Sequence, residues 1–232
     1  MLKAELHAHV RGDPIDGWIR YSARDLIDRL SSQGYDVVAI TPHTTLFSDP
    51  VAEAYARSRN MVLLRGIEAR IDACDVLIYT TQREIEQVRS WDELAAFRKA
   101  YPDALVIAPH PFFPRGVGQL ICERPDLFDA WEWSAFYSRS INLNRRLKAL
   151  SRTHGKPIVG AGDIHSLAQI GRTFTLIDAE RTPESVIEGV KRGAVSLETS
   201  PLRSVELIRM FAPLFPSYIR SHIARLLKPS KR

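Results

Sequence analysis

Cysteine is scarce in this chain: Cys74 and Cys122 are the two cysteines among 232 residues, and they do not form a C-x-x-C pair. A disulfide framework or a thiolate zinc site needs more sulfur ligands than these two residues offer. Any bound metal ion would therefore be held by histidine, aspartate and glutamate side chains.

Long apolar runs are also missing. No segment approaches the roughly 18 consecutive apolar residues that a membrane-spanning helix needs. The N-terminus lacks a charged region followed by a long apolar run, which a secretory signal would show. We therefore expect a soluble, cytoplasmic protein with no transmembrane segment, and the length favours one folded domain over residues 1–203.

A broad basic surface of the kind that binds nucleic acid is not indicated. The net charge of +5 comes from the C-terminal segment, since residues 203–232 contain seven Arg and Lys residues against Glu206 alone. We expect residues 204–232 to form a basic, amphipathic helical tail that is broken at Pro213 and Pro216. This tail would pack on the outside of the domain or, alternatively, contact a partner or a membrane surface.

Several catalytic loop motifs are absent as well. The sequence has no Gly-rich phosphate loop and no dinucleotide fingerprint, which disfavours nucleotide-cofactor chemistry. Ser134 and Ser166 do not lie in a nucleophile-elbow motif, so a Ser-His-Asp hydrolase is a poor interpretation.

What the chain does contain is an alternation of short apolar runs and helical patterns, which is typical of β/α units and a largely parallel sheet. Ser22 begins one helical pattern, Ser90 and Glu93 predict a capping box, and Thr182 followed by Pro183 predicts another helix start. Eight or nine strands in this length favour a small or distorted β/α barrel over a doubly wound sheet. The predicted strands are Leu2–Leu6, Val37–Thr41, Val62–Ile67, Val76–Thr80, Ala104–Ala108, Ala130–Trp133, Pro157–Ala161, Phe174–Ile177 and Ala194–Leu197.

Two histidines, His7 and His9, follow the first predicted strand. Residues at i and i+2 of a strand point to the same side, so both imidazoles could bind one metal ion. The pair alone is as compatible with two surface histidines. Other strand ends favour the metal site, because a barrel places its active site at the carboxyl ends of its strands. Further candidate ligands at or just after predicted strands are His43, Glu68, His110, Asp163 and His165.

Five short motifs in this order resemble those of the polymerase and histidinol phosphatase (PHP) superfamily. They are Glu5–His9 (ELHAH), Ala39–His43 (AITPH), Arg65–Glu68 (RGIE), Ala108–Pro111 (APHP) and Gly162–His165 (GDIH). Each motif is weak alone, but the ordered set is specific. The resemblance implies a distorted (β/α)7 TIM-like barrel that holds two or three divalent metal ions and hydrolyses phosphoesters.

Position by position, the resemblance implies that His7, His9, Glu68 and Asp163 bind a first metal ion. Glu68 would bridge to a second ion, which His110 also binds. Ligands of this kind suit zinc, manganese or iron.

A third ion would be bound by His43 and His165 together with an acidic group from the loop after the first strand. Asp13 is slightly favoured for this role over Asp16. The family often has Thr-Asp-His where this chain has Pro42 before His43, so an acidic neighbour that could orient the imidazole is missing.

A second departure concerns Asp75, which stands where the family often has a histidine. Asp75 could bind the second metal with altered affinity, or it could be a turn residue. Among the expected ligands, Glu68, Asp163 and His165 are the expected catalytic residues.

Three arginines are candidates for binding the substrate phosphate: Arg172 first, then Arg115 and Arg139. A guanidinium group matches phosphate oxygens in a bidentate way, although a surface ion pair explains Arg172 almost as well. Glu132, at the end of a predicted strand, is expected to orient a metal-binding imidazole or to line the substrate mouth.

These observations favour a metal-dependent phosphoesterase that acts on a small-molecule or oligonucleotide phosphoester through water activated in a multinuclear site. Two alternatives stay open. One is a metal-dependent amidohydrolase-type barrel, which also begins with His-x-His. The other is a degenerate barrel that serves as a scaffold or binding module without catalysis. The sequence does not identify the substrate, because the loops that would choose it carry no readable code.

Overall fold

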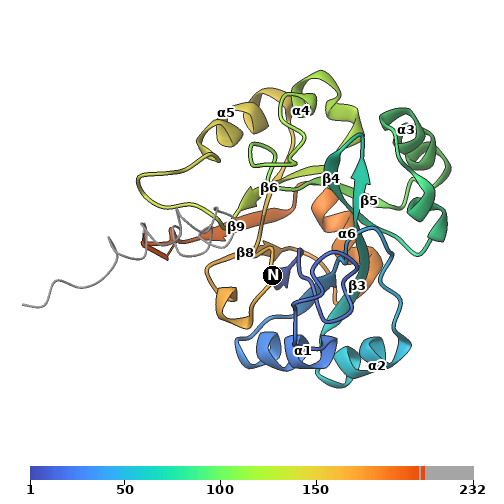
Figure 1. Ribbon diagram of the computed structural model, residues 1–232, viewed down its shortest axis with the longest axis vertical. Helices are drawn as coiled ribbons and strands as arrows, with labels where there is room; N and C mark the ends of the chain where they lie inside the picture. The colour runs from blue at the N-terminus through green and yellow to red at the C-terminus, as the bar shows by residue number, and fades with distance from the viewer. Residues whose placement is uncertain (204, 207–232) are drawn as a thin grey trace, which may run out of the picture.

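The computed structural model describes residues 1–203 and 205–206, and these form an α/β fold around one mixed, nearly closed, barrel-shaped sheet (Figure 1). The order of the nine strands across the sheet is β7-β6-β5-β4-β3-β2-β1-β8-β9. Each lies within about four residues of its predicted position. The strands are β1 (Leu2–Glu5), β2 (Val37–Ile40), β3 (Val62–Ile71), β4 (Cys74–Tyr79), β5 (Leu105–Ala108), β6 (Ala130–Ser134), β7 (Ile158–Ala161), β8 (Thr173–Ile177) and β9 (Val195–Thr199).

The helices begin where local side-chain chemistry predicts them. Ser22 accepts a hydrogen bond from the Asp25 amide, and Asp25 accepts one from the Ser22 amide, which completes a capping box. Ser90 and Glu93 do the same, and Thr182 caps the helix that starts at Pro183. The α-helices are α1 (Ala23–Ser32), α2 (Pro50–Ser58), α3 (Trp91–Ala100), α4 (Leu120–Glu123), α5 (Arg145–His154) and α6 (Pro183–Lys191); short 3₁₀ helices are η1 (Arg83–Gln87), η2 (Pro125–Leu127) and η3 (Leu167–Gln169).

The strand directions correct the expectation of a largely parallel sheet. The pairs β1–β2, β2–β3, β5–β6 and β6–β7 are parallel, whereas β3–β4, β4–β5, β1–β8 and β8–β9 are antiparallel. Within the described chain, β4 and β8 therefore run against the other strands. This arrangement departs from the regular alternation of a (β/α)7 barrel.

The reversal of β4 follows from the length of the link before it. Only Asp72 and Ala73 separate β3 from β4, and a parallel return needs a crossover of a dozen or more residues. Both residues have positive φ angles, 45° and 66°, as a two-residue hairpin turn requires. The hairpin carries β4 back along β3, so that the start of β4 lies beside the end of β3.

The barrel closes by two different kinds of contact. The segments that follow β1 and β7 pair directly through their backbones. The His9 amide donates to the Ile164 carbonyl at 3.0 Å, and the Ile164 amide donates to the His7 carbonyl at 3.0 Å. Between β7 and β8, a side chain completes the contact. The Thr175 hydroxyl accepts from the Gly160 amide and donates to the Gly160 carbonyl, both at 2.8 Å.

The barrel interior is apolar and continues onto α6. Leu6, Leu64, Ile107 and Val159 belong to one buried cluster that includes Val186 and Val190 of α6. Figure 1 shows α1, α2, α3 and α5 around the outside of the sheet, whereas α6 lies nearer the middle. Burial of these side chains supplies the main drive for folding and holds the strand ends in fixed positions.

The expected tail falls mostly outside the described residues, so its two short helices and its contacts stay predictions. The described part of the chain contains no helix that is long and apolar enough to cross a membrane. The boundary expected at residue 203 likewise stays a prediction.

Replacing Thr175 with valine tests the closure between β7 and β8. The substitution keeps the side-chain shape but leaves the buried Gly160 amide and carbonyl without the hydroxyl, so we expect the free energy of unfolding to fall by about 2–4 kcal/mol. Chemical denaturation would measure the loss, with Thr81→Val at an exposed position as the control, expected to change stability by less than about 0.5 kcal/mol. An unchanged stability in Thr175→Val would contradict this account of the closure.

Candidate metal centre

The candidate ligands gather at one end of the barrel, as the strand-end argument predicts. His7 and His9 follow β1, His43 follows β2, His110 follows β5, and Asp163 with His165 follow β7. Glu68 lies inside β3 rather than after it, because β3 continues to Ile71 before the hairpin. The reversed strand β4 contributes Asp75 near its first residue, which lies at the same end of the barrel.

Glu68 lies at the centre of the cluster. Its Oε2 atom is 3.4 Å from His7 Nε2, 3.3 Å from His9 Nε2 and 3.1 Å from His43 Nε2. Its Oε1 atom is 3.4 Å from His110 Nε2. The carboxylate is only 3% exposed, so these imidazoles replace the water that would otherwise surround it. One carboxylate with a different set of nitrogens at each oxygen is suited to bridge two cations.

The Nε2 atoms of His7 and His9 and the carboxylates that face them have the spacing of ligands around a metal ion. His7 Nε2 lies 3.3 Å from His9 Nε2, and Asp163 Oδ1 lies 3.4 Å and 3.5 Å from the same two nitrogens. Ligands about 2.0–2.1 Å from a tetrahedral zinc ion are about 3.3–3.4 Å from one another. With Glu68 Oε2 added, the five distances that involve the two nitrogens agree with this ligand spacing to within about 0.2 Å. The donor set therefore fits a divalent metal.

The other ring nitrogens of both histidines are held by carboxylates. His7 Nδ1 is 2.9 Å from Glu132 Oε2, and His9 Nδ1 is 2.9 Å from Asp13 Oδ2. A metal-binding histidine usually donates its second N–H to such a partner, which fixes the ring and the tautomer. With Nδ1 donating, Nε2 of each neutral ring presents a lone pair to the centre. Lone pairs and carboxylate oxygens that face one another require positive charge between them, either as protons or as a metal ion.

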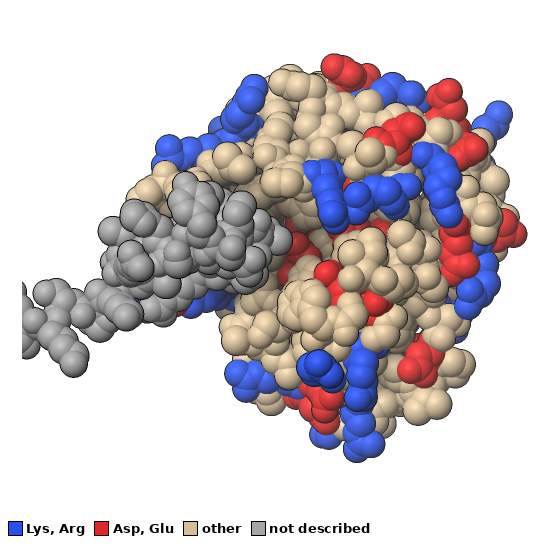
Figure 2. All heavy atoms as spheres, in the orientation of Figure 1, with Lys and Arg blue, Asp and Glu red and all other residues tan. Residues whose placement is uncertain are grey.

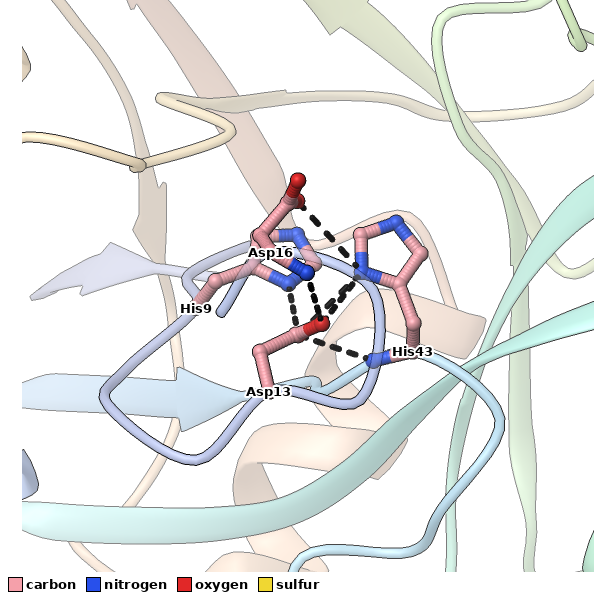
Figure 3. A group of neighbouring side chains, drawn as sticks. All are labelled: His9, Asp13, Asp16 and His43. Atoms are coloured by element: carbon pink, nitrogen blue, oxygen red, sulfur yellow. Dashed lines mark hydrogen bonds and ion pairs between the residues drawn. The ribbon is translucent and has the colours of Figure 1, made fainter. Parts of the chain in front are cut away.

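Asp13 connects two of the rings, as Figure 3 shows. Besides His9, its carboxylate lies 3.0 Å from His43 Nδ1 and accepts a hydrogen bond from the His43 amide. The structure thus supplies the acidic neighbour that Pro42 does not provide. Asp16 Oδ2 lies 2.8 Å from His165 Nε2 and 3.7 Å from His43 Nδ1. Both aspartates weighed from the sequence therefore lie in the cluster, with Asp16 nearer to His165.

Asp75 lies close to His110 and Glu68, and the three residues offer ligand atoms within 4.8 Å of one another. Asp75 is a buried strand residue and is not in a turn. Its Oδ1 atom is 2.7 Å from Arg70 Nε, and its amide donates to the Arg115 carbonyl at 2.8 Å. Burial and the charge of Glu68 raise the pKa of Asp75 to about 6. The Nδ1 atom of His110 is buried and has no hydrogen-bond partner.

The backbone is strained at two of these residues. His110 has a φ of 31° and Asp163 a φ of 46°, which residues other than glycine seldom adopt. Such conformations cost free energy and persist where the surrounding structure enforces them, often at functional sites. Here the strain turns side chains that leave β5 and β7 towards the cluster.

The cluster has more carboxylates than imidazoles, and it is buried. On the face shown in Figure 2, acidic side chains lie in a hollow near the middle, with Lys and Arg side chains beside it. Burial lowers the pKa of His7, but Asp163 and Glu68 outweigh it and raise that pKa well above its usual value. Burial alone would raise the pKa of Glu68. The neighbouring histidines outweigh burial and hold this pKa well below its usual range. The centre therefore attracts positive charge, as protons or as metal ions.

The three candidate arginines occupy different places. The Arg115 carbonyl accepts a hydrogen bond from the Asp75 amide, so Arg115 lies beside the cluster. Arg172 lines the same pocket as His165, and its Nη2 is 3.2 Å from Glu206 Oε1. Arg139 is exposed in the loop between β6 and α5, where its carbonyl accepts a hydrogen bond from Arg145 of α5.

Sequence reasoning did not single out Glu5. This fully buried carboxylate accepts hydrogen bonds from the amides of His7 at 3.0 Å and Gly162 at 2.9 Å, and so ties the ends of β1 and β7 together. Burial raises the pKa of Glu5 to about 8. The available signal was an acidic residue in the short strand that precedes the two histidines.

Comparisons with known proteins give one family match and a shared fold. Residues 142–195, which contain Asp163 and His165, match the PHP-associated family. No curated protein matches the chain.

Three solved structures share the fold. A two-domain protein from Bacteroides vulgatus, which contains a predicted PHP-like metal-dependent phosphoesterase, has a TM-score of 0.64 and 19% identity over 90% of this chain and 68% of that one. PsfC from Pseudomonas syringae has a TM-score of 0.66 and 14% identity over 96% of this chain and 98% of its own. A protein from Bifidobacterium adolescentis, predicted to be a metal-dependent phosphoesterase, has a TM-score of 0.53 and 16% identity over 82% and 96%. The chain therefore shares its fold with these proteins, and one segment of it matches the PHP-associated family.

Proposed function

We propose that this protein is a metal-dependent phosphoesterase that holds two or three divalent metal ions, with zinc, manganese and iron as the candidates. The observation that carries the proposal is that Glu68 Oε2 and Asp163 Oδ1 each lie 3.3–3.5 Å from both His7 Nε2 and His9 Nε2, the spacing of ligands around one zinc-like ion. The carboxylates of Glu132 and Asp13 behind the two imidazoles belong to the same arrangement.

Two further groups are proposed for the other ions. Glu68, Asp75 and His110 would hold the second ion, and Arg70 beside Asp75 supplies a positive charge that competes for the same carboxylate. His43 and His165 would hold the third, together with Asp16, whose Oδ2 atom lies 2.8 Å from His165 Nε2 and 3.7 Å from His43 Nδ1. In this arrangement Asp13 orients His9 and His43 through their Nδ1 atoms.

The residues of the chain act by holding and orienting. Bound ions would lower the pKa of a water molecule and neutralise charge on phosphoryl oxygens. Glu132 and Asp13 keep two imidazoles turned inward, and Glu68 offers each of its oxygens to a different set of nitrogens. His165 is the partly exposed histidine of the cluster, with its side chain 21% exposed, which places this ring where a substrate would arrive. Arg70 and Arg115 lie beside Asp75.

Two observations support catalysis over a scaffold role. Asp13 takes the place of the acidic neighbour that His43 lacks in the sequence. Asp75, the other departure from the family pattern, faces Glu68 and His110 instead of forming a turn. Both departures therefore leave a complete set of metal-binding groups.

The purified protein is expected to contain about two or three transition-metal ions per chain after supplementation with zinc, manganese or iron. Elemental analysis of the desalted protein measures this content. Less than about half an ion per chain would refute the metal centre, since the clustered donors would then be satisfied by protons alone.

Replacing Asp163 with asparagine should reduce phosphate release from 4-nitrophenyl phosphate by at least about 100-fold. Asparagine has the same shape and tolerates the positive φ at this position, but it removes the negative charge that faces His7 and His9. Circular dichroism would check that the fold is kept. The exposed Asp178→Asn serves as the matched control with normal turnover, and near-normal turnover of Asp163→Asn would show that the assignment is wrong.

Glu132→Gln should weaken metal binding about 10- to 100-fold, because the substitution keeps the contact to His7 Nδ1 but removes the charge that makes the ring a better ligand. Competition with a fluorescent chelator measures the affinity directly. Glu123→Gln, at an exposed position, should bind metal as the unchanged protein does. Equal affinity in both variants would remove Glu132 from the metal centre.

A further inference from the structure

A pocket of about 460 Å³ opens directly beside the candidate metal centre. Gly162 and His165 lie in its wall and also adjoin Asp163 within the cluster. A volume of this size falls within the range of small-molecule sites. The pocket is therefore continuous with the place where a phosphoryl group would be held.

The walls of this pocket are mainly apolar and aromatic. Trp18 stacks on His165, with ring centroids 5.8 Å apart and an angle of 15° between the planes, and its indole N–H donates to Asp16. The Trp18 ring is nevertheless 58% exposed, which is unusual for so large an apolar group. The remaining apolar wall comes from Ala135, Phe136, Ala168 and Leu202.

The polar groups in the wall are already paired with each other. Arg172 Nη2 lies 3.2 Å from Glu206 Oε1, so the two charges compensate. Gln169 Oε1 accepts hydrogen bonds from the amides of His165 and Ser166. A charged group in the pocket would have to displace one of these contacts, whereas a neutral ring would not. This pairing argues against Arg172 as the residue that binds the reacting phosphate.

We propose that this pocket binds an uncharged aryl group on the alcohol side of the substrate, so that the protein prefers phosphoesters whose leaving group carries an aromatic ring. The inference rests on the proposed phosphoesterase function. The ring would lie against Trp18 and Phe136 while the phosphoryl group stays at the histidine cluster. Hydrolysis would break the ester P–O bond, with water supplying the new oxygen of phosphate and a proton for the released alcohol.

The test compares 2-phenylethyl phosphate with ethyl phosphate on the full-length, manganese-loaded protein. The two alcohols are similar in acidity, so the difference in kcat/KM reports on the ring. We expect kcat/KM to be about tenfold or more higher for the phenylethyl ester, as burial of a phenyl group predicts. In Trp18→Ala the preference should fall at least about threefold, whereas Trp18→Phe should keep most of it. Val51→Ala, which trims another exposed apolar side chain on α2, should leave the preference unchanged.

Binding of 2-phenylethylphosphonate and ethylphosphonate, measured by calorimetry, separates this inference from the proposed function. If both esters are hydrolysed at equal kcat/KM, the aryl pocket is refuted and the phosphoesterase stands. If neither ester is hydrolysed, the proposed function loses its support and the phosphonates decide. Tighter binding of the phenylethyl compound, about tenfold and lost in Trp18→Ala, would uphold the pocket. Equal or absent binding of both compounds would overturn it.

Discussion

The burial of Glu68 among four imidazoles is the constraint on which the rest of the site depends. A carboxylate that is 3% exposed needs positive charge close to it, and three Nε2 atoms lie within 3.4 Å of one of its oxygens, so protons or a metal ion must stand between them. The residues around Glu68 hold the imidazoles in the positions that this requires. Glu132 and Asp13 fix the imidazoles from behind, and Asp163 adds a further oxygen in front.

The fold is what brings these groups together. Each of β1, β2, β5 and β7 ends next to a histidine or aspartate, and the barrel turns these separate ends into one rim. Direct pairing of the segments after β1 and β7 closes that rim, and Glu5 reinforces the junction by accepting from two backbone amides. The apolar interior below the rim is completed by α6, so rigidity comes from packing while the rim is left for polar groups.

Much of this arrangement was predictable from the sequence, because it follows from local patterns. Apolar runs located all nine strands to within a few residues, and capping side chains located the starts of α1, α3 and α6. The direction of β4 was not predictable in the same way, since its turn uses Asp72 and Ala73 instead of the Asn-Gly pair that usually signals a hairpin. Glu132 contacts His7 and Glu5 contacts Gly162, and the residues of each pair are more than 100 positions apart, so no local pattern encodes these contacts.

Anomalous scattering from crystals of the zinc- or manganese-loaded protein tests the central claim most directly. The account predicts a metal peak about 2.0–2.3 Å from His7 Nε2, His9 Nε2, Glu68 Oε2 and Asp163 Oδ1, with any further peaks on the Asp75–His110 and His43–His165 sides of Glu68. A fully loaded crystal without a peak between those four atoms, or with metal only at unrelated surface residues, would contradict it.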